Sequence, residues 1–111
     1  MIEIVRSCQY LEINSMINNV LLEENQKCHK LIHVNIKHQY DDTCSVKFFF
    51  VQEDAAVDQK VVVIRLETWE NFRESYVDEN VKELKKEGYD IQFWQAETLS
   101  LKCFTVLCFE M

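Results

Sequence analysis

The alternation of apolar and polar residues divides the chain into two similar halves. Each half begins with a short apolar stretch, at residues 2–6 and 61–66, of the kind that forms a β-strand. A segment with helical spacing follows, and then two further strand-like stretches. The order strand, helix, strand, strand therefore occurs twice, which predicts a tandem β-α-β-β repeat in an α+β fold.

Two segments carry apolar residues at every third or fourth position, as amphipathic helices do. In residues 8–28 these are Ile13, Met16, Ile17, Val20 and Leu21. In the segment that starts at Thr68 they are Trp69, Phe72, Tyr76, Val77, Val81 and Leu84. Gly88 follows the second segment where a left-handed C-cap is expected. The pattern predicts two helices, each with one apolar face.

The other side of the first helix is polar but carries little charge. Asn14, Asn18 and Asn19 lie there, whereas solvated helix faces usually carry charged side chains. Two interpretations are open. The simpler one is an exposed face with no particular role, and the other is a surface that contacts a partner.

The remaining strand-like stretches suggest how the sheet is built. Residues 31–38 alternate as in a half-buried strand, residues 44–51 and 99–109 are apolar on both faces, and another strand starts at 91–94. We expect a mostly antiparallel sheet of about six strands with both helices on one face. Since two helices cannot cover both faces, the other face or an edge strand should pack against a second copy, which predicts a homodimer.

An offset of 59 residues aligns the two halves and pairs Arg6 with Arg65. The final strands align better at an offset of 57, and this even change keeps side chains on their faces. Chance alignment of apolar residues is the alternative to duplication. A half of about 50 residues buries too little surface to be stable alone. Residues 1–53 and 60–111 are therefore expected to share one core in a single domain, residues 1–111.

Composition and charge limit the classes of function that we expect for the chain. The chain has 111 residues, 48% of them hydrophobic, with one glycine and no proline, which argues against disorder. Its net charge is −7, with −2 on residues 1–53 and −5 on residues 54–111, so general nucleic-acid binding is not expected. Five cysteines without regular spacing, no signal peptide and no apolar run long enough to span a membrane predict a cytoplasmic protein.

The residue types that carry chemistry show no pattern of an active site. Cysteines and histidines gather between Cys28 and Cys44, but without the short-spaced pairs of a zinc site. A single glycine rules out a glycine-rich phosphate loop. Asp41 and Asp42 lie in an expected turn, where aspartate is common. We therefore expect no enzyme activity, no metal and no cofactor.

An arginine and an aromatic residue recur at equivalent positions of the two halves. Each arginine ends the first strand and each aromatic residue opens the helix after it. Arginine can grip an oxyanion and a ring can stack on a base, so a ligand site is one interpretation. The simpler one is that the ring packs the helix onto the sheet and the arginine is solvated. The candidate ligand-binding residues are Arg6, Tyr10, Arg65, Trp69, Lys37 and Trp94.

Three motifs of the first half carry a family resemblance: Ile2-Glu3-Ile4-Val5-Arg6, Leu11-Glu12-Ile13 and Asn35-Ile36-Lys37-His38-Gln39. In these, residues 1–53 resemble the small sporulation-associated proteins of Gram-positive bacteria and their phages, which consist of one β-α-β-β unit. The chain differs in its second copy and in having fewer acidic residues at the start of the helix. The resemblance implies a small cytoplasmic accessory protein of host or phage origin, and no established activity.

This context suggests two functions of different classes. In the first, the chain is a non-enzymatic binding protein that sequesters a nucleotide-type anionic signal molecule to counter host defence. In the second, it is an acidic protein–protein interaction module or inhibitor, in an anti-defence or regulatory role, without a small-molecule ligand. A pocket where arginines and aromatic rings converge would distinguish the first from the second.

Overall fold

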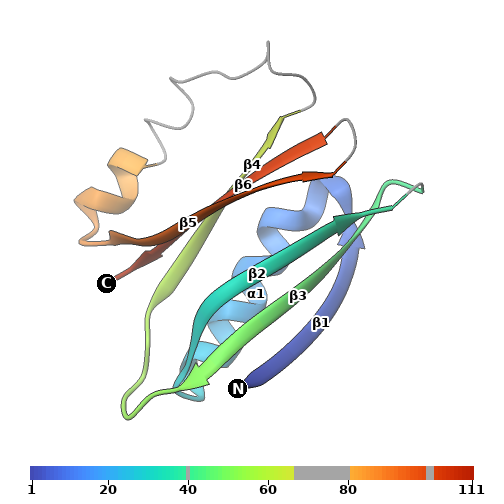
Figure 1. The fold of residues 1–111 in the computed structure, drawn as a ribbon. Coiled ribbons are helices and arrows are strands. Elements are labelled where there is room, and N and C mark those ends of the chain that lie inside the picture. The colour runs from blue at the N-terminus through green and yellow to red at the C-terminus, as the bar shows by residue number, and fades with distance from the viewer. Residues whose placement is uncertain (40, 67–80, 100–101) are drawn as a thin grey trace.

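The computed structural model describes residues 1–39, 41–66, 81–99 and 102–111, without the side chains of residues 64–66, 96–99 and 102–104. Its elements are β1 (Ile2–Gln9), the 3-10 helix η1 (Tyr10–Glu12), α1 (Ile13–Gln26), β2 (His29–His38), β3 (Thr43–Gln52), β4 (Gln59–Leu66), β5 (Asp90–Leu99) and β6 (Lys102–Glu110). Residues 81–86 are also helical, and the rest of the predicted second helix lies outside the described residues. The predicted α+β class is confirmed (Figure 1).

The six strands form two antiparallel sheets of three strands each. Sheet A has the order β1-β3-β2 and sheet B has the order β4-β6-β5 (Figure 1). The expected six strands and their antiparallel pairing are confirmed, but the expectation that they form one sheet was wrong. The expectation that both helices cover one face concerns a second helix that lies largely outside the described residues. Alternation in the sequence reveals strands, but their neighbours depend on contacts between distant residues.

The two sheets have the same internal topology. In each, the last strand of the half lies between the first and the second. Each also shows a register shift near the start of its second strand, between Leu31 and His33 in β2 and between Ile91 and Phe93 in β5. These shared features are what a tandem repeat would produce, and the duplication itself stays a prediction.

β1 runs further than predicted, and α1 starts later. β1 continues to Gln9 because β3 offers a pairing partner along its whole length, as far as Thr43 opposite Gln9. The Tyr10 N–H then donates to the Asp42 carbonyl at 2.8 Å before the chain turns into η1 and α1. Pairing with a distant strand thus overrides the local helical pattern of residues 8–12.

One hydrophobic core unites both halves. It lies between the inner face of sheet A, α1 and the inner face of sheet B. Its fully buried members include Ile13, Ile17 and Leu21 of α1, Leu31 and Val34 of β2, Phe48 and Phe50 of β3, and Val106 and Cys108 of β6. The shared core fits the expectation that neither half is stable alone.

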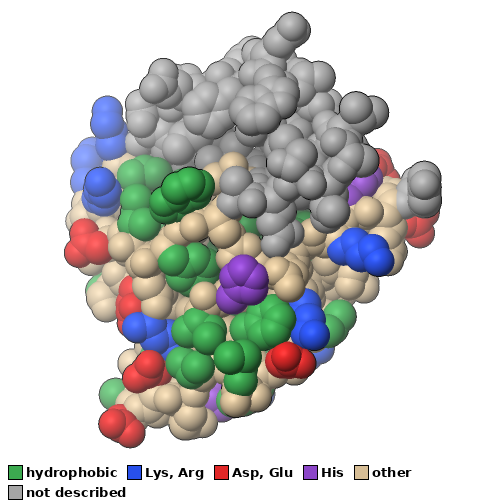
Figure 2. All heavy atoms as spheres, viewed as in Figure 1, with side chains coloured by type: hydrophobic (Ala, Val, Ile, Leu, Met, Phe, Trp, Pro, Cys, Tyr) green, Lys and Arg blue, Asp and Glu red, His purple; other side chains and the backbone are tan. Residues whose placement is uncertain are grey.

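The outer face of sheet A is only partly covered by its own side chains. Val5 of β1 is 53% exposed, and the half-buried Phe49 of β3 has His33 beside its ring (5.5 Å) and the Lys47 ammonium over it (5.3 Å). Figure 2 shows hydrophobic side chains grouped with a histidine and lysines on this face. The face is therefore mixed in character, and the predicted homodimer stays a prediction.

Gly88 ends the second helix as the sequence predicts. Its φ is +100°, a conformation that side chains other than glycine rarely adopt. The Gly88 N–H donates to the Lys85 carbonyl (3.1 Å) and the Tyr89 N–H to the Leu84 carbonyl (2.9 Å). These two bonds are the Schellman motif, so the predicted C-cap is confirmed.

α1 lies along the open edge of β4 and binds its backbone with asparagine side chains. Asn18 accepts a hydrogen bond from the Val61 N–H (2.9 Å) and donates one to the Val61 carbonyl (2.8 Å). Asn14 accepts a bond from the Val63 N–H at 2.9 Å. A strand edge leaves backbone groups that need partners, and α1 provides them here. The uncharged face of the helix is thus a contact surface, and its partner is β4 of the same chain.

The open edge of β2 is bound in the same way by glutamines of sheet B. Gln59 of β4 accepts a hydrogen bond from the Leu31 N–H (2.8 Å) and donates one to the Leu31 carbonyl (3.0 Å). Gln95 of β5 accepts a bond from the Val34 N–H at 3.2 Å and donates to the Val34 carbonyl. Side-chain amides therefore join the two sheets in place of a ladder of backbone hydrogen bonds.

Replacing Asn18 by alanine should lower the free energy of unfolding by about 2 kcal/mol, because two partly buried backbone groups of Val61 lose their partners. Asn19→Ala is the matched control, since Asn19 is exposed on the same helix and the change in helix propensity is identical. Urea unfolding followed by circular dichroism measures both. Equal stability of the two variants would show that the Asn18 bonds to Val61 contribute nothing.

Candidate functional site

A groove of about 690 Å³ opens between α1, β4 and the helical segment 81–86. Its volume lies in the range of ligand-binding clefts. Asn18, Asn19, Leu22, Asn25 and Gln26 line it from α1, residues 57–62 line it from β4 and the segment before it, and Glu83, Leu84 and Glu87 line the third side. Two helical walls over a strand thus enclose the groove.

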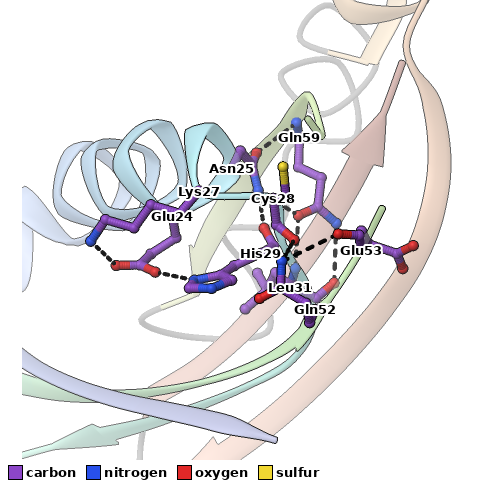
Figure 3. A network of polar contacts seen from close by, with 9 residues as sticks. All are labelled: Glu24, Asn25, Lys27, Cys28, His29, Leu31, Gln52, Glu53 and Gln59. Atoms are coloured by element: carbon purple, nitrogen blue, oxygen red, sulfur yellow. Dashed lines mark hydrogen bonds and ion pairs between the residues drawn. The ribbon is translucent and has the colours of Figure 1, made fainter. Parts of the chain in front are cut away.

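The floor of the groove is a buried network of amides (Figure 3). Asn25 and Gln59 are 5% and 4% exposed. The Asn25 carboxamide accepts a bond from the Gln59 backbone N–H (3.0 Å) and donates to the Gln59 side-chain oxygen (3.1 Å) and the His29 carbonyl (2.8 Å). Because Gln59 also binds Leu31, the network connects α1, β4 and β2.

A buried carboxylate extends this network at the end of α1 (Figure 3). Glu24, 6% exposed, lies 2.7 Å from the His29 Nδ1 and 3.3 Å from the Lys27 ammonium. A carboxylate only accepts hydrogen bonds, so the His29 Nδ1 carries the proton. Burial acts to raise the pKa of Glu24, but the hydrogen bonds and charges of His29 and Lys27 outweigh it and hold the pKa below its usual 4.5.

The rim of the groove is acidic. Asp58, Glu83 and Glu87 face a single cation, Lys60, within the described lining. The Lys60 ammonium lies 3.5 Å from Glu87 and 5.1 Å from the centre of the Tyr89 ring. The Tyr89 hydroxyl donates to Asp58 at 2.7 Å, and burial, followed by this bond and the charge of Asp58, raises the pKa of Tyr89 to about 12. Tyr89 therefore stays neutral at physiological pH.

Burial changes the properties of two of the cysteines that the structure describes. Cys8, Cys28 and Cys108 are free thiols. Burial raises the pKa of Cys108 to about 12, and burial with the nearby Glu12 raises that of Cys8, so both remain protonated at neutral pH. Among the described residues, no three His, Cys, Asp or Glu side chains gather closely enough to hold a metal ion.

The candidate residues of sheet A do not come together. Arg6 is exposed on the α1 side of β1, where its guanidinium donates to the Val5 carbonyl at 3.0 Å. Tyr10 is only 6% exposed, packs in the core and meets the His38 ring edge-on at 5.3 Å. Lys37 is exposed on the outer face.

The strand register shows why Arg6 and Lys37 are apart. Arg6 and Ile36 both pair with Val46, and the side chains of Ile36 and Val46 are buried in the core. Lys37 pairs with Ser45, the residue that precedes Val46 in β3. Successive strand residues point to opposite faces, so Arg6 and Lys37 lie on opposite faces of sheet A.

The candidates of the second half are only partly visible. Trp94 is 67% exposed on β5, so its ring is accessible. Arg65 lies in β4, but its side chain is outside the described residues, and so is the whole of Trp69. The convergence of these three residues stays a prediction.

Sequence reasoning missed the residues that line the groove. Leu22 is 65% exposed, and the rim residues Asp58, Glu83 and Glu87 come from two separate segments. The only signal in the sequence was the uncharged face of the first helix. It pointed to a contact surface without revealing which segment would lie against it.

The comparisons with known proteins identify no relative. The scan against protein-family models found no match, and the searches of curated proteins and of solved structures found none either. The resemblance of residues 1–53 to sporulation-associated proteins therefore stays a prediction.

Gln59→Glu should destabilise the fold by about 3 kcal/mol at neutral pH, because a buried carboxylate replaces the amide that donates to the Leu31 carbonyl. Burial should give the new carboxyl a higher pKa in the folded state than in the unfolded chain. The penalty is then absent below the unfolded pKa and grows as the pH rises. Gln9→Glu at an exposed position is the control, and urea unfolding at pH 4 and pH 7 measures both. A penalty of equal size at the two pH values would contradict the assigned role of the Gln59 amide.

Glu24→Gln should cost about 1–2 kcal/mol at pH 7, because it replaces charge-assisted hydrogen bonds with neutral ones. The pKa of Glu24 is lower in the folded state, so the carboxylate's contribution is complete above the unfolded pKa and is lost as the pH falls through the folded pKa. The stability difference from the unsubstituted chain should therefore narrow once the pH drops below 4.5.

Thermal unfolding at a series of pH values tests this expectation. Glu23→Gln, at the exposed neighbouring position, is the control. A difference between Glu24→Gln and the unsubstituted chain that stays constant down to low pH would show that Glu24 makes no such contribution.

Proposed function

We propose that this chain is a non-enzymatic interaction module that binds a protein partner through its acidic surface, in an anti-defence or regulatory role. The observation that supports this most is the groove beside α1. Three carboxylates and one lysine lie along its described lining, and that lysine is already paired with Glu87. A surface of this kind attracts basic partners and repels anions.

The same observation weighs against the other function expected from the sequence, sequestration of a nucleotide-type signal. A nucleotide needs cations for its phosphates and a ring for its base in one place. Arg6 and Lys37 lie on opposite faces of sheet A, and Tyr10 is buried. Arg6 and Lys37 therefore do not share one phosphate site, and the Arg65 side chain and Trp69 lie outside the described residues.

The cellular context remains as the sequence predicts it. Phage origin, a cytoplasmic location and a homodimer are all expectations that accompany this proposal. No helix in the described parts of the chain is long and apolar enough to cross a lipid bilayer.

A thermal-shift screen against nucleotides, cyclic nucleotides and ADP-ribose-type molecules should leave the Tm unchanged. A ligand that binds only the folded state raises the Tm by mass action, so the screen detects sequestration directly. Arg6→Ala and Arg65→Ala are the controls. A rise in Tm with one ligand that both variants lose would contradict the proposed function and establish sequestration instead.

A further inference from the structure

The groove beside α1 offers an apolar surface that the fold leaves open. Leu22 of α1 is 65% exposed, and Leu84 stands half-buried on the opposite wall. Val57 and Val62, both half-buried, continue this surface between them. A side chain that enters the groove can therefore bury apolar area against both helical walls.

The polar groups of the groove differ in whether their hydrogen-bonding capacity is already used within the protein. Asn25 and Gln59 on the floor are bonded to each other and to the backbone. Asn19 and Gln26, two exposed residues of the groove lining, make no side-chain hydrogen bond within the described chain. A ligand must therefore find its polar partners at the rim and not at the floor.

The charges of the rim indicate which ligand fits. Lys60 is held between Glu87 and the Tyr89 ring, so its charge is compensated within the protein. Glu83 has no ion pair among the described residues, and Asp58 meets only the neutral Tyr89 hydroxyl. Two carboxylates thus remain uncompensated beside an apolar cleft, which suits a cation carried next to an apolar side chain.

We infer that the groove between α1 and residues 81–87 binds a short amphipathic segment of a partner protein, with leucine-type side chains in the cleft and lysine or arginine at the rim. This inference rests on the proposed function and specifies its site. The open walls formed by two helices resemble the mode in which a segment lays its apolar face into a groove. The rim carboxylates then select basic segments over acidic ones.

The test is a titration with a short synthetic peptide of leucines and lysines at helical spacing, followed by NMR. The readout is the side-chain amide signals of Asn19 and Gln26, with Asn35 on the outer face as the internal reference. We expect the signals of Asn19 and Gln26 to shift. The same peptide with glutamate for lysine should not bind, and spermidine should bind more weakly than the leucine–lysine peptide because it has no apolar side chains.

A pair of matched double variants tests whether the rim carboxylates contribute to the affinity for the peptide. Glu83→Gln with Glu87→Gln removes one uncompensated carboxylate and releases Lys60 from its ion pair, so it should weaken the binding of a basic peptide roughly fivefold. Glu3→Gln with Glu23→Gln changes the net charge equally and should leave the affinity unchanged. The pairs match closely, because Glu3 and Glu87 each lie 3.5 Å from a lysine, whereas neither Glu23 nor Glu83 has an ion pair in the described chain.

A second pair of variants tests the apolar wall. Leu22→Gln should weaken binding about tenfold, since it removes a large apolar contact, and Leu11→Gln at another exposed leucine should have no effect. Absence of peptide binding, equal losses from both acidic pairs, or spermidine binding as tightly as the peptide would overturn the inference. A nucleotide that raises the Tm would instead contradict the proposed function, so the two failures are distinguishable.

Discussion

The backbone groups at the open edges of β2 and β4 are the constraint on which the rest of the structure depends. Each edge exposes N–H and C=O groups that cost free energy if they are buried without partners. Within the described residues, no strand forms a ladder with these edges. Asparagines of α1 bind β4, and Gln59 and Gln95 bind β2, each through an amide that can both donate and accept.

This use of side-chain amides shapes the whole molecule. A side chain reaches further than a ladder hydrogen bond, so the two sheets remain separate while their inner faces share one core. α1 serves both purposes at once, with Ile13, Ile17 and Leu21 in the core and Asn14 and Asn18 on β4. Because the helix is fixed against the edge of β4, the groove forms beside it, and the same network provides the groove floor.

The strand register and the burial within sheet A explain why the candidate residues of the first half do not come together. Arg6 and Tyr10 follow each other closely in the chain, but the exposed Arg6 lies beside α1 and Tyr10 packs in the core. Equivalent residues of two copies converge only if the copies pack together through the faces that carry those residues. The groove instead combines α1 of the first half with β4 and residues 83–87 of the second, which no internal repeat would reveal.

Local patterns determined much of this protein. Alternating stretches and continuous apolar runs located all six strands, helical spacing located α1, and the position of Gly88 fixed a helix end. These features depend on the side-chain periods of strands and helices and on the freedom of one glycine. The uncharged asparagine face of the first helix was also evident in the sequence. The tertiary structure decided the division into two sheets, the extension of β1 to Gln9 and the place of the groove. These depend on which backbone edges meet which side chains across long sequence separations, and periodicity carries no information about such contacts.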